Sequence, residues 1–185
     1  NMRKAIFSIS ILAMMAVTLF SMTSCGDDKD ETKPAEEVKV KEVLFTVKTK
    51  PNADMLKYTD VCVTTKVGKG EPKTQVIDAT HTECSVTVES ANFPTTVKVE
   101  YTCTKKAGVR PEDDYKVEIP HDFTVAKYQI KTDGTKEQVI DNPEYAYTAT
   151  SSFMGNKWDL LVSQIFSHTR TYAIGMYGSI TTQKD

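Results

Sequence analysis

The side chains that could carry acid–base or metal chemistry are scattered along the chain. The three histidines, His81, His121 and His168, are isolated in sequence, and His121 is followed directly by a carboxylate, Asp122. A serine or cysteine nucleophile needs a base that is itself held by a third group, and no serine here lies in a nucleophile-elbow motif. No pair of cysteines has the spacing of a zinc site. The sequence therefore predicts neither an enzyme nor a metal or cofactor site.

Two of the cysteines occupy positions that would permit a disulfide. Cys84 shares one face of an expected strand with Val86 and Val88, and Cys103 shares a face of the next expected strand with Tyr101. If a turn joins the two strands, the thiols of Cys84 and Cys103 could lie nearly opposite each other. A disulfide is possible in an exported protein, but cysteine is also a common small core residue. Both interpretations remain open.

Aromatic side chains suggest one candidate ligand-binding surface. Tyr145 and Tyr147 lie on the same face of an expected strand. Together with Trp158 or Tyr177 they could form an aromatic platform for sugar rings. The alternative is that the tyrosines pack against neighbouring strands and keep their hydroxyls in water.

The elements that would position these residues are short strands. After Val38, apolar and polar residues alternate, and this period of two is typical of a half-buried strand. Similar runs recur at about ten-residue spacing, with turn residues between them: Tyr58–Val67, Lys73–Asp78, Cys84–Glu89, Thr96–Thr104, Tyr115–Lys131, Lys136–Asp141 and Tyr145–Thr150. Asp133-Gly134 is the clearest hairpin turn, and Pro120 predicts an edge or a bulge within a long strand. The fold class predicted is mainly β, an antiparallel β-sandwich that is immunoglobulin-like or related.

One segment near the C-terminus has a different period. Trp158, Leu161, Val162, Ile165 and Phe166 recur at the spacing of one helical face, and Asn156 is placed to cap it. The pattern predicts an amphipathic helix from about Lys157 to Ser167, with His168 at its end, followed by a final strand.

Length and charge exclude several classes of protein. The chain has 185 residues, enough for one domain with its own core, and we assign that domain to residues 38–185. Residues 1–24 contain Arg3 and Lys4 and no acid, so the remaining chain has 21 basic and 25 acidic side chains. The excess of acids lies between Gly26 and Glu37, which leaves the domain formally neutral. A neutral domain lacks the positive surface that phosphate backbones require, so nucleic acid is not expected as a partner.

The first 24 residues have the order of a secretory signal. Arg3 and Lys4 precede an apolar run from Ala5 to Phe20, and small residues follow before Cys25. An uncleaved transmembrane helix is the alternative, because the run approaches the length that spans a bilayer.

Cys25 points to lipidation rather than simple secretion. The motif Met22-Thr23-Ser24-Cys25 resembles a bacterial lipobox, with Met22 where leucine is usual. The resemblance implies cleavage before Cys25 and attachment of acyl chains to its thiol. Each buried acyl methylene contributes about 0.8 kcal/mol, so two or three chains would anchor the protein stably in a membrane.

The residues after Cys25 suggest where the domain faces. Asp27, Asp28, Asp30 and Glu31 resemble the acidic export signal of surface lipoproteins of the Bacteroidetes type. This resemblance implies an outer-membrane protein exposed at the cell surface, with residues 25–37 as lipidated cysteine and linker. A periplasm-facing anchor with an ordinary solvated linker is the alternative.

The predicted location at the cell surface and the predicted fold class together favour a binding role. We expect a non-enzymatic cell-surface lipoprotein that binds a glycan or a protein partner. The second hypothesis is a structural subunit of a fimbria-like filament, in which one copy would donate a strand to the sheet of its neighbour.

Overall fold

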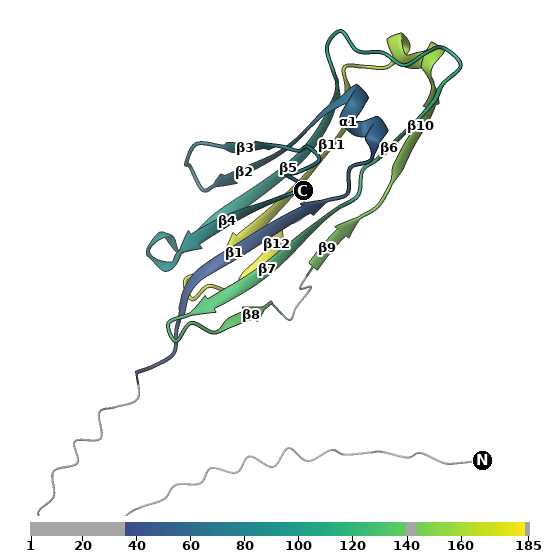
Figure 1. Cartoon of the computed structure of the whole chain (residues 1–185). Helices are drawn as coiled ribbons and strands as arrows, with labels where there is room; N and C mark the ends of the chain where they lie inside the picture. The colour runs from purple at the N-terminus through teal and green to yellow at the C-terminus, as the bar shows by residue number, and fades with distance from the viewer. Residues whose placement is uncertain (1–35, 140–143, 184–185) are drawn as a thin grey trace, which may run out of the picture. The chain divides into compact units, whose positions relative to one another are not determined.

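The computed structural model of the protein describes residues 36–139 and 144–183, and residues 37–185 form one compact unit. Within the described residues this unit is mainly β-structure (Figure 1). Its strands are β1 Val40–Thr49, β2 Thr59–Val67, β3 Lys73–Val76, β4 Glu83–Glu89, β5 Thr95–Lys105, β6 Lys116–Pro120, β7 Phe123–Lys131, β8 Lys136–Gln138, β9 Glu144–Tyr147, β10 Thr150–Met154, β11 Gln164–Ile174 and β12 Ile180–Gln183. The helical elements are α1 Ala53–Tyr58 and two 3₁₀-helices, η1 Ser90–Asn92 and η2 Gly155–Leu160.

The strands form antiparallel sheets. One five-stranded sheet has the order β4-β1-β7-β8, with β9 also paired to β7, and the other has the order β12-β11-β5-β2-β3. A two-stranded sheet, β10-β6, continues the direction of β9 and β7. The prediction of a mainly β protein with antiparallel sheets is confirmed.

The core lies between the two five-stranded sheets. The Phe45 ring on β1 lies 5.2 Å from the Tyr172 ring on β11, and the Tyr101 ring on β5 stacks at 4.8 Å on the Phe123 ring on β7, measured between centroids. Alternate valines complete the buried layer: Val43, Val47, Val61, Val63, Val97, Val99 and Val125. The period of two in the sequence thus places the apolar side of each strand against the opposite sheet.

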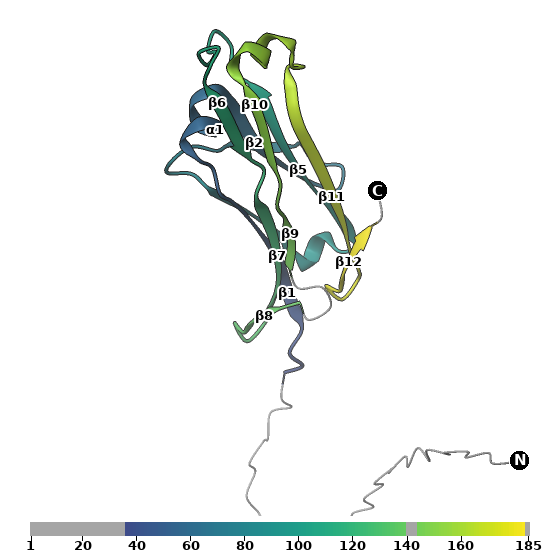
Figure 2. The same ribbon diagram turned by 90° about the vertical axis from the view of Figure 1, so that its right-hand side faces the viewer.

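The domain has two distinct ends, defined here by the direction of β1. At the near end β1 begins at Val40, beside the turns that join β7 to β8 and β11 to β12. At the far end lie α1, the β5–β6 connection and η2 (Figures 1 and 2). The ten residues of β1 separate the two ends by roughly 33 Å at the usual rise per residue.

Two local predictions are confirmed. Asp133-Gly134 forms the turn between β7 and β8, where Gly134 has a φ of 85° and donates its N–H to the Lys131 carbonyl at 3.0 Å. Pro120 ends β6, and the chain resumes as β7 only at Phe123. A proline cannot donate to a strand ladder, which explains the interruption of the long strand.

The predicted amphipathic helix at Lys157–Ser167 is wrong. The structure has the short η2 up to Leu160, and β11 begins at Gln164 and pairs with β5. The register between β11 and β5 shifts between Gln164 and Phe166, so an extra residue is inserted there. A bulge of this kind breaks the period of two and leaves apolar residues at a spacing that resembles a helix.

The N-terminal predictions lie outside the described residues. They comprise the signal sequence 1–24 with Met22, Thr23 and Ser24, the lipidated Cys25, and the acidic signal of Asp27, Asp28, Asp30 and Glu31. Within 36–139 and 144–183, no helix is long and apolar enough to cross a membrane.

Candidate binding site

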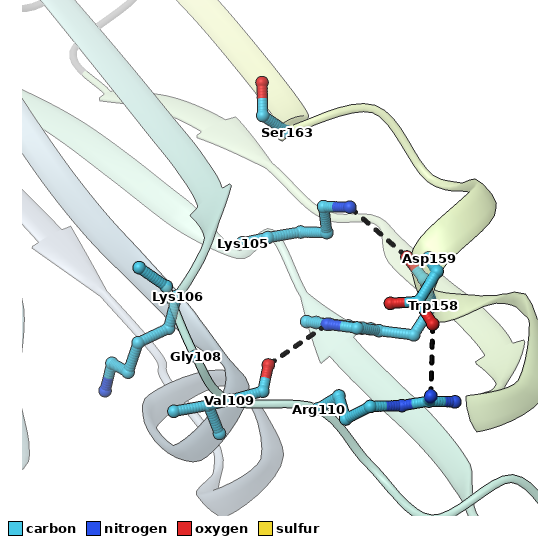
Figure 3. Close-up of a pocket in the computed structure, with 9 residues that line it drawn as sticks. Lys105, Lys106, Gly108, Val109, Arg110, Trp158, Asp159 and Ser163 are labelled. Carbon is cyan, nitrogen blue, oxygen red and sulfur yellow. Dashed lines mark hydrogen bonds and ion pairs between the residues drawn. The ribbon is translucent and has the colours of Figure 1, made fainter.

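The β5–β6 connection and η2 enclose a hollow at the far end of the domain. Its volume is about 430 Å³, and it is lined by Lys105, Lys106, Ala107, Gly108, Val109, Arg110, Trp158, Asp159 and Ser163. Figure 3 shows that the Lys105, Trp158 and Arg110 side chains lie along it, with Lys106 turned away from Trp158. The Lys106 ammonium instead donates to the Leu56 carbonyl in α1 at 2.8 Å.

Lys105 holds the two walls of the hollow together. Its ammonium donates to the carbonyl oxygens of Leu161 at 2.8 Å and Trp158 at 3.3 Å. These carbonyls lie at the end of η2, where a cation is favourable, and the Trp158 carbonyl also accepts the Leu161 N–H at 3.3 Å. The Lys105 backbone N–H also donates to the Ser163 carbonyl at 2.7 Å. The last residue of β5 therefore fixes the segment that leads into β11.

Arg110 makes a second connection across the rim. Its guanidinium lies 2.6 Å from an Asp113 oxygen on its own loop and 3.1 Å from an Asp159 oxygen on η2. All three side chains are exposed, so these ion pairs contribute little to stability. They do set the charge of the rim, because both acids are already paired with the same arginine.

Trp158 forms the floor of the hollow. Its indole N–H donates to the Val109 carbonyl at 3.2 Å, and its ring lies 5.7–5.8 Å from those of Tyr58 and Phe153. The residue is only 3% exposed. A ring buried in this way offers no open face on which a sugar could stack.

Large apolar side chains remain exposed beside the hollow. Leu160 is 76% and Val162 is 72% exposed, whereas Leu161 between them is partly buried. The apolar spacing predicts Val162 on the buried face of a helix, and because β11 and the short η2 replace that helix, this prediction is wrong. The exposed apolar pair was therefore missed, and nothing in the sequence period marks it.

The structure separates the residues of the predicted aromatic platform. Tyr145 and Tyr147 lie on β9. Trp158 lies in η2 at the far end, where it packs against Tyr58 and Phe153. Tyr177 lies in the β11–β12 turn at the near end and is 90% exposed. The four aromatic residues therefore do not form one surface.

Tyr145 and Tyr147 belong to a ring cluster at the side of the two sheets. The Tyr145 hydroxyl lies 2.7 Å from His168 Nε2, and the Tyr147 ring lies 4.9 Å from the His168 ring. The Arg170 guanidinium stands 4.0 Å above the Tyr145 ring. Because Arg170 covers this face, it is closed to a ligand. The alternative interpretation, packing between strands, fits these contacts.

His121 lies near a hydroxyl but lacks a carboxylate partner. Its Nε2 is 2.8 Å from Ser151 Oγ, and its ring stacks on Phe166 at 4.3 Å between centroids. Its Nδ1 is buried and has no hydrogen-bond partner among the described residues, as is also true of Asp122 Oδ1. Burial lowers the pKa of His121, with a smaller opposing effect from Asp122. The imidazole is therefore neutral at pH 7, and no third group orients it.

The possible Cys84–Cys103 disulfide is not formed. Cys84 on β4 and Cys103 on β5 are free thiols, as is Cys62 on β2. Although β4 and β5 follow each other in sequence, β4 pairs with β1 while β5 pairs with β2 and β11, so they lie in different sheets. Burial raises the pKa of Cys84 to about 11 and that of Cys103 to about 11. Both thiols remain protonated at neutral pH and are poor nucleophiles.

The candidate site is assigned neither by a metal-binding cluster in the described residues nor by similarity to a known protein. No group of three or more histidine, cysteine or acidic side chains in the described part of the chain is arranged to hold a metal ion. In comparisons with known proteins, no family model, curated protein or solved structure matches the chain.

Proposed function

We propose that the protein is a non-enzymatic lipoprotein of the outer-membrane surface, whose domain binds a protein partner at the far end. We also propose that the domain is an immunoglobulin-like or related sandwich. The observation that carries the binding proposal is the position of the far-end hollow, with exposed Leu160 and Val162 beside it. It lies at the opposite end of β1 from Val40, where the chain from the proposed anchor at Cys25 arrives.

The anchor proposal rests on the N-terminal sequence. Twelve residues separate Cys25 from Val38, and an extended chain of that length reaches roughly 40 Å. Such a linker joins the anchor to the near end of the domain, and a surface at the far end would then face the medium.

A protein partner fits the far end better than a glycan does. Sugar rings usually stack on an open aromatic face, and the Trp158 ring is buried. Exposed apolar side chains that lie together instead mark surfaces that contact other proteins. Leu160 and Val162 supply the apolar part, in the segment between Asp159 and Ser163, which line the hollow.

The non-enzymatic part of the proposal rests on the surroundings of His121. A serine nucleophile requires a base whose other nitrogen is oriented by a carboxylate or an equivalent group. His121 reaches Ser151, but its Nδ1 is buried among described residues without such a group.

A fimbria-like subunit is the second candidate, and the free edge of β11 favours it. β12 pairs with β11 only from Thr171 to Ile174, whereas β5 pairs with β11 along almost its whole length. The segment Gln164–Ser167 thus pairs with β5 on one edge and has no ladder with β12 on the other. Edges of this kind accept an added strand from another chain.

The test of the anchor proposal is the intact mass of the protein extracted from membranes of its native type of host. We expect loss of residues 1–24 and addition of acyl chains, and a Cys25→Ala variant that lacks both changes. Protease treatment of whole cells should digest the anchored domain. An unmodified N-terminus would contradict the anchor, and protection from protease would contradict surface exposure.

Binding at the far end is tested with the compact unit of residues 37–185, which lacks the signal sequence and the lipid, on cell surfaces that carry candidate partners. Saturable binding should be lost in a Leu160→Ser/Val162→Ser variant. Val76→Ser is the matched control, because Val76 is an exposed valine (58%) on β3. Unchanged binding by the double variant would refute the far-end site. Concentration-dependent ladders that survive mild denaturation, without saturable binding, would favour the fimbria-like subunit.

A further inference from the structure

A second group of exposed apolar side chains lies at the near end, and we define it as the near-end patch: Val38, Met176 and Tyr177. They are 53%, 65% and 90% exposed, respectively. They border a hollow of about 700 Å³ that is also lined by Lys39, Lys41 and Thr132. A protein that faces only water does not usually expose its largest side chains together. The proposed function at the far end does not account for this patch.

The turn that carries Met176 and Tyr177 is held firmly against the start of β1. Gly175 donates to the Ser179 carbonyl at 2.8 Å, and Gln129 Nε2 donates to the Gly178 carbonyl at 2.8 Å. A Cβ added at Gly178 would lie 2.6 Å from Val40 Cγ1, so the backbone of the β11–β12 turn at Gly178 is in close contact with Val40 at the start of β1. The β11–β12 turn therefore lies against the start of β1, where the chain enters the domain (Figure 2).

The N-terminal segment that leads into the near end indicates which partner covers the near-end patch. The segment that precedes Val38 leads back to Cys25, the proposed lipid attachment site, and its extended reach is roughly 40 Å. Because the segment joins the domain at the near end, this end is the one that meets the bilayer first. Tyrosine is enriched at membrane–water interfaces, where its ring is apolar and its hydroxyl stays wet.

The charges around the patch fit a headgroup layer. Lys41 is exposed at the start of β1, and Lys39 lies 3.1 Å from Glu37 on the same segment. Lysine side chains beside an apolar surface can place their ammonium groups among anionic headgroups while their methylenes cover the apolar atoms. The aromatic and aliphatic side chains of the near-end patch thus lie beside two lysines, of which Lys39 is paired with Glu37, and interfacial contacts combine such groups.

We infer that the near-end patch rests in the headgroup region of the membrane that carries the lipid anchor. The inference rests on the proposed anchor at Cys25 and adds an orientation to it. Met176 and Tyr177 contact the bilayer, β1 points away from it, and the far-end hollow faces outward. The domain is then docked on the membrane rather than suspended freely from its linker.

The test uses the single tryptophan of the chain as an internal reference. Trp158 lies at the far end, so its emission should be insensitive to the membrane. The acylated full-length Tyr177→Trp variant is reconstituted in vesicles of phosphatidylcholine and phosphatidylglycerol, with or without brominated acyl chains, which quench nearby indoles. We expect the added emission to be lost in the brominated vesicles, while the wild-type emission stays constant. Val76→Trp is the matched control at an exposed position on β3 and should resemble the wild type.

The outcomes distinguish failure of the proposed docking of the near-end patch from failure of the proposed lipid anchor. Flotation of the wild-type protein with vesicles, abolished in a chain that begins at Glu37 and so lacks both the signal sequence and the acyl chains, reports the anchor alone. Flotation with equal emission of Tyr177→Trp in both vesicle types would overturn the docking of the patch and leave the anchor intact. A blue shift that depends on protein concentration and not on bromine would assign the patch to a second copy and also overturn the inference. Absence of acylation and flotation would overturn the anchor and the docking together.

Discussion

The Lys127 ammonium on β7 lies 5.3 Å from the centroid of the Tyr172 ring on β11, which places a cation between the two sheets. Lys127 is 1% exposed and occupies a position where the strand pattern expects an apolar residue. Burial lowers the pKa of Lys127, and the nearby Arg170 lowers it further. The cation–π contact offsets part of this cost, because such contacts contribute about 0.5–2 kcal/mol.

Replacement of Lys127 by methionine should stabilise the domain. Exchange of a buried charge for an apolar side chain of similar length is often neutral or favourable, so we expect the free energy of unfolding to rise by about 1 kcal/mol. Denaturant unfolding measures the change. Lys136→Met is the matched control, because Lys136 also lies over a tyrosine ring, 4.2 Å from that of Tyr128, but is exposed on β8. A loss of stability in Lys127→Met would show that the ammonium makes a favourable interaction that outweighs its burial.

The same lysine should give the wild type a distinctive pH dependence. Because the pKa of Lys127 is lower in the folded state, the unfolded chain binds its proton more tightly. Stability then increases with pH as the pH approaches the ordinary lysine pKa from below. The Lys127→Met variant should lack this increase, and equal slopes for both proteins would contradict the lowered pKa.

His121 should make the domain less stable in mild acid. Burial lowers the pKa of His121, so its contribution is fully present above the unfolded pKa near 6.5 and is lost as the pH falls below it. We expect the free energy of unfolding to decrease between pH 7 and pH 5, with a smaller decrease in His121→Gln. Chemical denaturation at several pH values measures the two slopes. Parallel slopes would mean that His121 titrates alike in both states.

The strands could be predicted from the sequence because each buries one face. In β5, for example, Val97, Val99, Tyr101 and Cys103 alternate with exposed or half-buried residues, and the core reads directly from that alternation. The helix prediction failed where a bulge opposite Thr104 and Cys103 broke the alternation. Local spacing alone cannot distinguish a bulged strand from a short helix, because pairing with β5 decides the outcome.

The candidate site was much less predictable than the strands. The predicted place of Trp158 in a ligand platform was wrong, because the residue is buried. Its partners Tyr58 in α1 and Val109 in the β5–β6 connection come about one hundred and about fifty residues earlier in the chain, respectively. α1 itself has six residues and no helical period of apolar residues, so it was missed. The choice between a Cys84–Cys103 disulfide and two core thiols stayed open for a related reason: consecutive strands enter different sheets, and the sequence carries no signal for that crossover.

The three thiols of the domain should be protected in the folded state. Burial raises the pKa of Cys62, Cys84 and Cys103, so each is protonated at pH 7.5. We expect iodoacetamide to label them slowly in native protein and completely after unfolding in denaturant without reductant. Mass spectrometry counts the adducts. Two thiols that stay unlabelled in denaturant until reductant is added would reveal a disulfide and contradict the free cysteines of the structure.

Trp158 should contribute to the stability of the domain, because it forms the floor of the far-end hollow and packs in the core. Trp158→Phe keeps most ring contacts but removes the donor to the Val109 carbonyl, which should cost about 1 kcal/mol in unfolding free energy. Trp158→Ala also removes the ring from its contacts with Tyr58 and Phe153 and should cost about 3–5 kcal/mol. Leu160→Ala is the control: a side chain that is 76% exposed should change stability by about 0.5 kcal/mol or less.

Unfolding free energy and partner binding, measured on the same variants, distinguish residues that stabilise the fold from residues that contact the partner directly. If Leu160 and Val162 contact the partner, Leu160→Ala should weaken binding while stability stays constant, because their exposed atoms do not hold the fold together. Trp158→Phe should lower stability first and change binding only as far as the Val109 backbone moves. If Trp158→Phe abolished binding with no loss of stability, the indole itself would contact the ligand. The hollow would then have to open around Trp158, and a stacked sugar would again become a plausible ligand.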